Sequence, residues 1–207
     1  MPLIRRGPPA NPPASSTPVT PPGLLETGST SERWAAARAL GQVASAAQSL
    51  ARALRTEKAS EVRQAIFTSF VLIRTREAAE ALASFIGSDD AELRTGALDA
   101  LGAMMDVARP LLPALLNDAD PDVRLLACEL VRPLDPTDGT ALLCRMLETE
   151  QQPNVCGAAV DVLSEIGLVS AVAALRQSAE RFAGDAYLGF AIADAIARTS
   201  KRPVSNG

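Results

Sequence analysis

Residues 118–127 read Asp118-Ala119-Asp120-Pro121-Asp122-Val123-Arg124-Leu125-Leu126-Ala127, and the core of this stretch returns along the chain. Two earlier triplets share its signature, Glu61-Val62-Arg63 and Glu92-Leu93-Arg94. An arginine opens an Ala/Leu-rich stretch in steps of 30, 31 and 30 residues, at Arg33, Arg63, Arg94 and Arg124. Two degenerate copies follow, each 32 residues on, at Asn154-Val155-Cys156 and Ala186-Tyr187-Leu188. Self-similarity at this period predicts a solenoid of stacked units.

The segments between turns predict pairs of helices. The first pair is a helix after Ser31 that contains Trp34, followed by a helix over 44–55. The later predicted pairs are 59–73 with 77–86, 91–105 with 110–116, 121–131 with 140–147, and 153–166 with 170–182. A last helix over 186–197 closes the chain, and Pro133 and Pro136 interrupt the end of the fourth unit's first helix. We therefore expect an all-α, right-handed α-solenoid of about five helix pairs plus a C-terminal capping helix.

The first helix of each predicted pair carries an apolar stripe that must be buried against a neighbouring pair. Apolar or small residues stand three, four and seven positions after each arginine position, as in Ile66, Phe67 and Phe70 or in Ala97, Leu98 and Leu101. This is the spacing of one helical face. A single pair cannot bury such a face, whereas stacking of successive pairs does so.

The first thirty residues differ in composition from the rest. Residues 1–30 hold eight of the fifteen prolines, with Ser, Thr, Gly and Ala between them. Such a segment offers too little apolar surface to offset its ordering entropy, so we expect a disordered tail, then a repeat domain over 31–199 and a disordered end over 200–207. The tail is interpreted as a solubilising linker; Pro9-Ala10-Asn11-Pro12, which has P-x-x-P spacing, leaves open a docking peptide.

Charge and composition exclude several classes of partner. The net charge is -4, and because both ends are basic the repeat region is more acidic than this sum. An acidic body argues against binding to nucleic acids or to anionic membranes, which need a basic face. No stretch is long and apolar enough to span a bilayer, and the odd count of three cysteines indicates reduced thiols in a cytoplasmic protein. Only two of the 20 basic residues are lysines, a bias that suggests a GC-rich bacterial genome.

Catalytic and metal-binding signals are absent from the sequence. There is no histidine, no P-loop, no nucleophile elbow and no cysteine spacing typical of zinc. Cys128 lies on the apolar stripe and is interpreted as a small buried hydrophobe. We expect no catalytic residue, no cofactor and no metal site. Trp34 and Tyr187, at opposite ends of the repeats, are interpreted as fillers at the ends of the core, with binding hot spots as the alternative.

The repeated motif resembles that of the HEAT-repeat family, in particular the short bacterial repeats of the phycobilisome-lyase type. The likeness is carried by residues 118–127 and by Glu92-Leu93-Arg94-Thr95-Gly96-Ala97-Leu98-Asp99-Ala100-Leu101-Gly102, and it covers about residues 31–199. It implies an armadillo-type fold that binds proteins. It also implies that the arginine bonds to an acidic residue and to the backbone of adjoining repeats, which Asp118 with Arg124 and Glu57 with Arg63 match. The sequence departs from the pattern where Cys156 and Leu188 replace the arginine.

The repeated arginines admit two interpretations. As a functional set they form a basic ladder for an acidic peptide or a phosphate. As a structural set they tie one repeat to the next, which we favour because every arginine has an acidic residue nearby. The structural inter-repeat residues are then Arg33, Arg63, Arg94, Arg124, Asp118 and Asp122.

These observations favour a non-enzymatic scaffold or adaptor. We expect a protein partner to bind on the concave face formed by the second helices, and the chain to be a monomer or part of a hetero-complex. The alternative is an enzyme-associated protein, either a relative of the chromophore lyases or a regulatory subunit.

Overall fold

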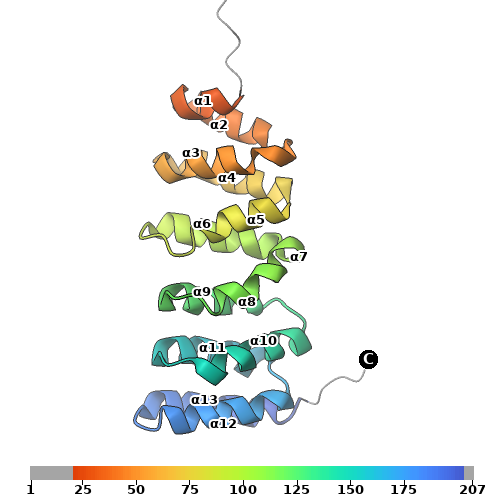
Figure 1. Ribbon diagram of the computed structural model, residues 1–207, viewed down its shortest axis with the longest axis vertical. Helices are drawn as coiled ribbons and strands as arrows, with labels where there is room; N and C mark the ends of the chain where they lie inside the picture. The colour runs from red at the N-terminus through yellow and green to blue at the C-terminus, as the bar shows by residue number, and fades with distance from the viewer. Residues whose placement is uncertain (1–20, 203–207) are drawn as a thin grey trace, which may run out of the picture.

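The computed structural model describes residues 21–202 as a single stack of helices (Figure 1). Six helices form one row and are called the first helices: α2 (Thr30–Leu40), α4 (Ser60–Ile73), α6 (Ala91–Ala103), α9 (Pro121–Val131), α11 (Pro153–Ile166) and α13 (Ala186–Thr199). The second helices are α3 (Ala47–Thr56), α5 (Arg76–Ala83), the short pair α7 (Met105–Ala108) and α8 (Leu112–Leu115), α10 (Pro136–Thr149) and α12 (Val172–Arg181). The predicted α-solenoid, with one unpaired helix at its C-terminal end, is confirmed.

Acidic and hydroxyl side chains start many of these helices. Asp90 accepts hydrogen bonds from the backbone N–H groups of Glu92 and Leu93 at the start of α6, and Asp120 accepts one from Asp122 at the start of α9. Ser29 and Glu32 form a reciprocal capping box at the start of α2. These bonds satisfy N–H groups that have no partner within the helix. They set where each repeat begins.

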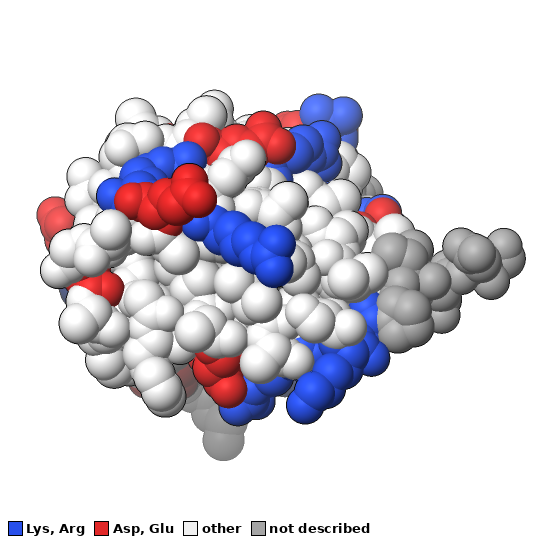
Figure 2. Space-filling view, turned by 90° about the horizontal axis from the view of Figure 1, so that it is seen from below, with Lys and Arg blue, Asp and Glu red and all other residues white. Residues whose placement is uncertain are grey.

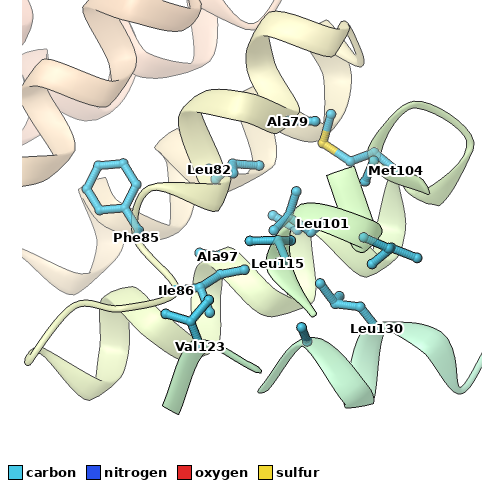
Figure 3. Packing of buried hydrophobic residues seen from close by; sticks show 14 of the residues in the cluster. Ala79, Leu82, Phe85, Ile86, Ala97, Leu101, Met104, Leu115, Val123 and Leu130 are labelled. Carbon is cyan, nitrogen blue, oxygen red and sulfur yellow. The ribbon is translucent and has the colours of Figure 1, made fainter. Parts of the chain in front are cut away.

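The core runs as one continuous cluster along the stack. Figure 3 shows its middle part, where Leu82 and Ile86 of one repeat lie near Leu101 and Val123 of the next two. The predicted apolar stripe is buried throughout, apart from the half-buried Leu98. Ala, Leu and Val dominate because small side chains let neighbouring helices approach closely, and each repeat buries its apolar face against the adjoining repeats.

The structure corrects the predicted boundaries at both ends. Residues 21–27, which were expected to belong to the disordered tail, form α1 (Pro21–Thr27), whose Leu25 is buried against the first repeat. At the other end, Arg202 accepts a hydrogen bond from Val169 N–H at 3.0 Å and donates to the Ser164 carbonyl, so residues 200–202 belong to the repeat domain. The predictions for 1–20 and 203–207, including the P-x-x-P segment, fall outside the described residues.

Two internal predictions also differ from the structure. Helix α10 begins at Pro136, four residues before the predicted start, because Asp135 caps it and proline fits its first turn. In α13 the N-cap is Asp185, which makes Gly189 the residue four positions on, where α6 and α9 have their arginines. The motif position in the last helix is therefore Gly189 rather than Leu188, whose side chain is buried.

Candidate functional site

Each repeated arginine binds a backbone carbonyl just before its own helix. Arg63 donates from Nε to the Glu57 carbonyl at 2.9 Å, and Arg124 donates from Nη1 to the Asp118 carbonyl at 2.8 Å. Arg94 donates to the Ser88 carbonyl at 2.7 Å, and Arg33 to the Gly28 carbonyl at 2.8 Å. The guanidinium thus holds the turn that enters its helix. Both pairs implied by the family resemblance are found, but through carbonyl oxygens rather than carboxylates.

Three of the four arginines also reach a carboxylate of the following repeat. Arg33 binds Glu57 through two hydrogen bonds, Nε to Oε2 at 2.7 Å and Nη2 to Oε1 at 3.0 Å. Arg124 binds Glu150 in the same two-pronged way, at 2.8 and 2.9 Å. Paired parallel bonds of this kind are among the strongest that side chains make. Each links one first helix to the turn that precedes the next one.

Arg63 uses a different pair of carboxylates. The residue six positions before Arg94 is Ser88, which offers no carboxylate, whereas Glu57 and Glu150 stand six positions before Arg63 and Cys156. Arg63 binds Asp90 at 2.9 Å and Glu92 at 2.6 Å instead. The contact between repeats is therefore kept while its acidic partner moves.

The acidic partners have lowered pKa values. The hydrogen bonds from Arg33, supported by the N–H groups of Ala59 and Lys58, lower the pKa of Glu57 to about 2. Burial on its own would raise the pKa of Glu150, whose side chain is only 2% exposed. The bonds from Arg124 and from the backbone of Gln152 and Gln151 outweigh this effect and lower the pKa. Both carboxylates are therefore ionised at neutral pH.

Arg94, Asp118 and Asp122 do not join this set of ion pairs. The Ser88 carbonyl is the only described group that accepts a hydrogen bond from the Arg94 side chain. The Asp118 carboxylate accepts from the N–H of Asp120 at 2.9 Å, and Asp122 is exposed, with no ion pair to a residue in 21–202. The residues that sequence reasoning missed are Glu57 and Glu150 as carboxylates and Asp90. The available signal was the position of Glu57 and Glu150, each six residues before the motif position of the next repeat.

A second set of ion pairs joins successive repeats away from the repeated arginines. Arg132, the residue that follows α9, pairs with Glu129 of that helix and with two residues of α11, Asp161 at 3.0 Å and Glu165. Between other repeats, Arg74 reaches Asp106 at 2.7 Å and Arg109 reaches Asp138 at 2.6 Å. These arginines are also engaged in contacts between repeats.

Burial disfavours ionisation of the three cysteine thiols. Burial raises the pKa of Cys128 to about 12, and burial also raises the pKa values of Cys144 and Cys156. Cys128 is fully buried, as predicted. A thiol must ionise to act as a nucleophile, and burial opposes this. Within residues 21–202 no group of three His, Cys, Asp or Glu side chains could hold a metal ion, and no helix is long and apolar enough to cross a membrane.

The exposed side of the second helices carries charges of both signs. Its charged residues are Arg52 and Arg55 of α3, Arg76, Glu77 and Glu80 of α5, Arg145 and Glu148 of α10, and Arg176 and Glu180 of α12. Arg76 and Glu80 pair with one another at 2.8 Å within α5. The segment formed by α7 and α8 adds the exposed Asp106 and Arg109, which are held in ion pairs, and the uncharged Pro113 and Ala114. This is the side on which the sequence predicted a binding surface.

The aromatic residues at the two ends are more exposed than the core-filler interpretation implies. Tyr187 is 85% exposed and Phe190 75% exposed, both on α13. They line a groove of about 540 Å³ between α11 and α13, together with Gly157 and Ala158. Trp34 is also partly exposed, with the Arg38 guanidinium 5.0 Å from its ring centre. Within residues 21–202, Tyr187 is therefore a surface residue rather than a filler of the core.

Comparison with known proteins finds one matching family model and several similar structures. The family model for HEAT repeats matches residues 108–186. No curated protein sequence matches the chain significantly. A designed armadillo repeat protein in complex with the peptide (KR)4 is similar in structure at 14% identity and a TM-score of 0.44, over 88% of this chain and 100% of that one. An engineered protein is similar at 18% identity and a TM-score of 0.44, over 90% of this chain and 100% of the other.

A natural protein also appears among the similar structures. It is the complex of CpcE and CpcF of the phycocyanin lyase from Nostoc sp. PCC7120, at 18% identity and a TM-score of 0.35, over 95% of this chain and 99% of the other. The match to the HEAT-repeat model covers residues 108–186, and the helix pairs that precede this range carry the same repeated arginine.

Proposed function

We propose that the protein is a non-enzymatic scaffold that binds a protein partner along the exposed side of its second helices. The observation that carries this proposal is that the other candidate groups, the repeated arginines and the cysteine thiols, are already engaged within the fold. Three of the four repeated arginines are held in ion pairs between repeats. Cys128 and Cys156 are buried, Cys144 is half-buried, and burial raises the pKa of all three thiols. A ladder of arginines occupied in this way does not present a basic row to an acidic peptide or a phosphate.

The second helices supply a surface suited to a partner of mixed charge. The cationic residues of α3 stand beside both signs of charge on α5, and the pattern of alternating sign returns on α10 and α12. Opposite charges at matched positions give specificity and speed of association more than affinity. A helix or extended segment with its own alternating charges fits this face. We therefore expect the partner to be a protein rather than a nucleic acid.

Site-specific crosslinking tests the location of the contact. A photoreactive residue placed at Glu80 or Arg145, both exposed on second helices, is compared with one at Asp99 or Glu129, both exposed on first helices. Crosslinking in the native host is expected to yield one discrete adduct from the second-helix positions and none from the first-helix positions. An adduct only from the first-helix positions would contradict the proposed face.

Charge reversal tests the role of the charged residues in binding, and visible spectroscopy tests the non-enzymatic role. Arg145→Glu is expected to weaken capture of the crosslinked partner at least tenfold with an unchanged melting temperature, because the residue is exposed. Arg38→Glu, on a first helix, is the matched control. Visible absorbance by the protein purified from its native host would instead favour the enzyme-associated alternative.

A further inference from the structure

A groove of about 540 Å³ lies between α11 and α13, near one end of the stack. Figure 2 views the molecule from this end and shows a largely uncharged central area, with most charged side chains toward its margins. Counted from the N-caps Gln152 and Asp185, residues that line the groove stand at matching positions of the two helices. The matching pairs are Asn154 with Tyr187, Gly157 with Phe190, and Asp161 with Asp194. The groove therefore has an aromatic part and, about one turn farther along, an acidic part.

The aromatic part has room for a large apolar side chain. A Cβ atom at Gly157 would meet nothing within 4 Å, and Phe190 across the groove is 75% exposed. Helices α4 and α6 show what a glycine in a first helix can admit. There the ring of Phe67 lies so close to Gly96 that a Cβ atom would be 2.2 Å from it. Gly157 likewise leaves space in which an apolar side chain of a ligand can pack beside Phe190.

The acidic part favours a cation. Asp161 and Asp194 stand at the same level of the two helices, and among the described residues no lysine or arginine lines the groove. Asp161 pairs through Oδ2 with Arg132 at 3.0 Å, and Asp194 pairs through Oδ2 with Arg198 at 2.7 Å. Arg132 is shared with two glutamates. A carboxylate accepts hydrogen bonds on both oxygens, so the two aspartates can bind a further donor, and their charge attracts a positive one.

We propose that this groove binds an extended segment of a partner protein in which an apolar residue and an arginine stand two positions apart. The two parts of the groove are four residues apart along each helix, which is about 6 Å at the helical rise. In an extended segment, side chains two positions apart lie on one face and are separated by about 6.6 Å.

Both side chains of such a segment find a partner in the groove. The apolar side chain lies over Gly157 beside Phe190. The guanidinium group reaches Asp161 and Asp194, and arginine is preferred to lysine because its planar fork of donors can bind two carboxylates at once. The site lies on first helices and is separate from the side of the second helices proposed above as a binding surface.

The chain's own Leu3-Ile4-Arg5-Arg6 has the same spacing, but its place in the chain favours a separate partner. This segment lies outside the described residues, and residues 7–20 join it to α1 at the opposite end of the stack. These fourteen residues span at most roughly 46 Å when fully extended, while the four steps from α2 to α11 take up roughly 32–40 Å. A connection stretched in this way would lose nearly all its conformational freedom, which is costly. A partner's segment is not constrained in this way.

NMR titration of the isotope-labelled full chain with short peptides tests the ligand chemistry. The probe is Ala-Ala-Leu-Ala-Arg-Ala-Ala with blocked ends, and it is expected to shift the amide signals of α11 and α13. Replacing its arginine by glutamate, or moving its leucine next to the arginine, is expected to weaken binding at least tenfold. Signals that stay unmoved at millimolar peptide, or equal binding of either altered peptide, would overturn the proposal.

A leucine placed in the groove tests the location. Gly157→Leu fills the space beside Phe190 and is expected to weaken peptide binding at least tenfold. Because a Cβ atom there meets nothing within 4 Å and leucine is a better helix former than glycine, the variant is expected to keep its melting temperature. Gly102→Leu, in equally open space on α6, is the matched control and is expected to bind like the wild type. Undiminished binding by Gly157→Leu would place the peptide elsewhere and contradict the proposal.

Charge removal tests the acidic part. Asp161→Asn combined with Asp194→Asn keeps the shape of both side chains and is expected to weaken peptide binding at least tenfold. The melting temperature is expected to change little, because exposed ion pairs contribute little to stability. Asp99→Asn, exposed on α6, is the matched control and is expected to leave binding unchanged. An equal loss in the control would indicate a general effect of charge and contradict the assignment.

A last variant separates a partner from the chain's own segment. Arg5→Glu combined with Arg6→Glu in the full chain is expected to leave the amide signals of α11 and α13 where they are in the absence of peptide. Movement of these signals would show that the chain's own segment occupies the groove, and it would overturn the assignment to a partner protein.

Discussion

At the scale of single residues, the repeated arginines differ in what they hold. Arg124 binds a buried carboxylate of the next repeat, whereas Arg94 binds only a backbone carbonyl of its own repeat. The arginine at the same motif position therefore contributes differently to the free energy of unfolding in the two repeats. Removing one partner of a buried ion pair is costly chiefly because the remaining charge stays buried without compensation.

Comparison of two alanine variants measures this difference. Arg124→Ala leaves the nearly inaccessible Glu150 without its cation and is expected to lower the free energy of unfolding by about 3 kcal/mol or more. Arg94→Ala removes one hydrogen bond to a carbonyl and is expected to cost about 1 kcal/mol. Urea unfolding of both variants at neutral pH checks the order. Equal losses would contradict the structural distinction between them.

The lowered pKa of Glu57 predicts a specific loss of stability in acid. The pKa of Glu57 is about 2 in the folded chain, against 4.5 for an ordinary glutamate, so its contribution to stability is complete above about pH 4.5 and disappears as the pH falls toward 2. Glu57→Gln keeps the shape and the acceptor for the N–H groups of Lys58 and Ala59 but removes the charge. The variant is expected to be less stable than the wild type at pH 7, and the gap is expected to close by pH 2. A gap independent of pH in urea titrations would contradict this prediction.

At the scale of helices, glycine controls how closely α4 and α6 approach. A Cβ atom at Gly96 would lie 2.2 Å from the ring of the buried Phe67, whereas one at Gly102 would meet nothing within 4 Å. Both glycines belong to α6, so their intrinsic helix propensities are comparable. The first is required by packing and the second is not.

Alanine at the two positions is expected to have opposite effects. Gly96→Ala forces the Phe67 ring to shift within a filled core and is expected to destabilise the protein by about 1–3 kcal/mol. Gly102→Ala is expected to stabilise it by up to about 1 kcal/mol, because alanine is the better helix former. Thermal unfolding of the two variants checks both signs. Stabilisation by Gly96→Ala would show that α4 and α6 are not packed as closely as described.

Much of the helical arrangement could be predicted from the sequence, since a period and an apolar stripe are local properties. The start of α10 was missed because Pro136 was interpreted as a helix breaker, although the preceding Asp135 makes it a first-turn residue. The carboxylates of Glu57 and Glu150 were missed for a different reason. Their partners lie in the preceding repeat, and neither spacing nor composition says which side of a turn faces back along the stack.

At the scale of the whole molecule, stability is expected to vary along the stack. Interior repeats have neighbours on both sides, whereas α1 and α13 each pack against the stack from one side only. In such nearest-neighbour systems the ends open more readily than the middle. Hydrogen exchange of the dilute chain is expected to be slowest in α4, α6, α9 and α11 and faster in α1 and α13. Uniform protection along the chain would indicate a single cooperative unit instead.

The moving acidic partner of the arginines has a consequence for how such a chain changes over evolutionary time. Repeat arrays grow and shrink by duplication and loss of whole units, which is harmless only where the units are interchangeable. Here the unit that begins with Ser88 serves Arg63 through Asp90 and Glu92, while the unit that begins with Glu150 serves Arg124 through its first carboxylate. A unit exchanged between these two kinds of junction would carry an acceptor arranged for a different predecessor, whereas the units that begin with Glu57 and Glu150 offer the same acceptor. The junctions therefore constrain which repeats can exchange places.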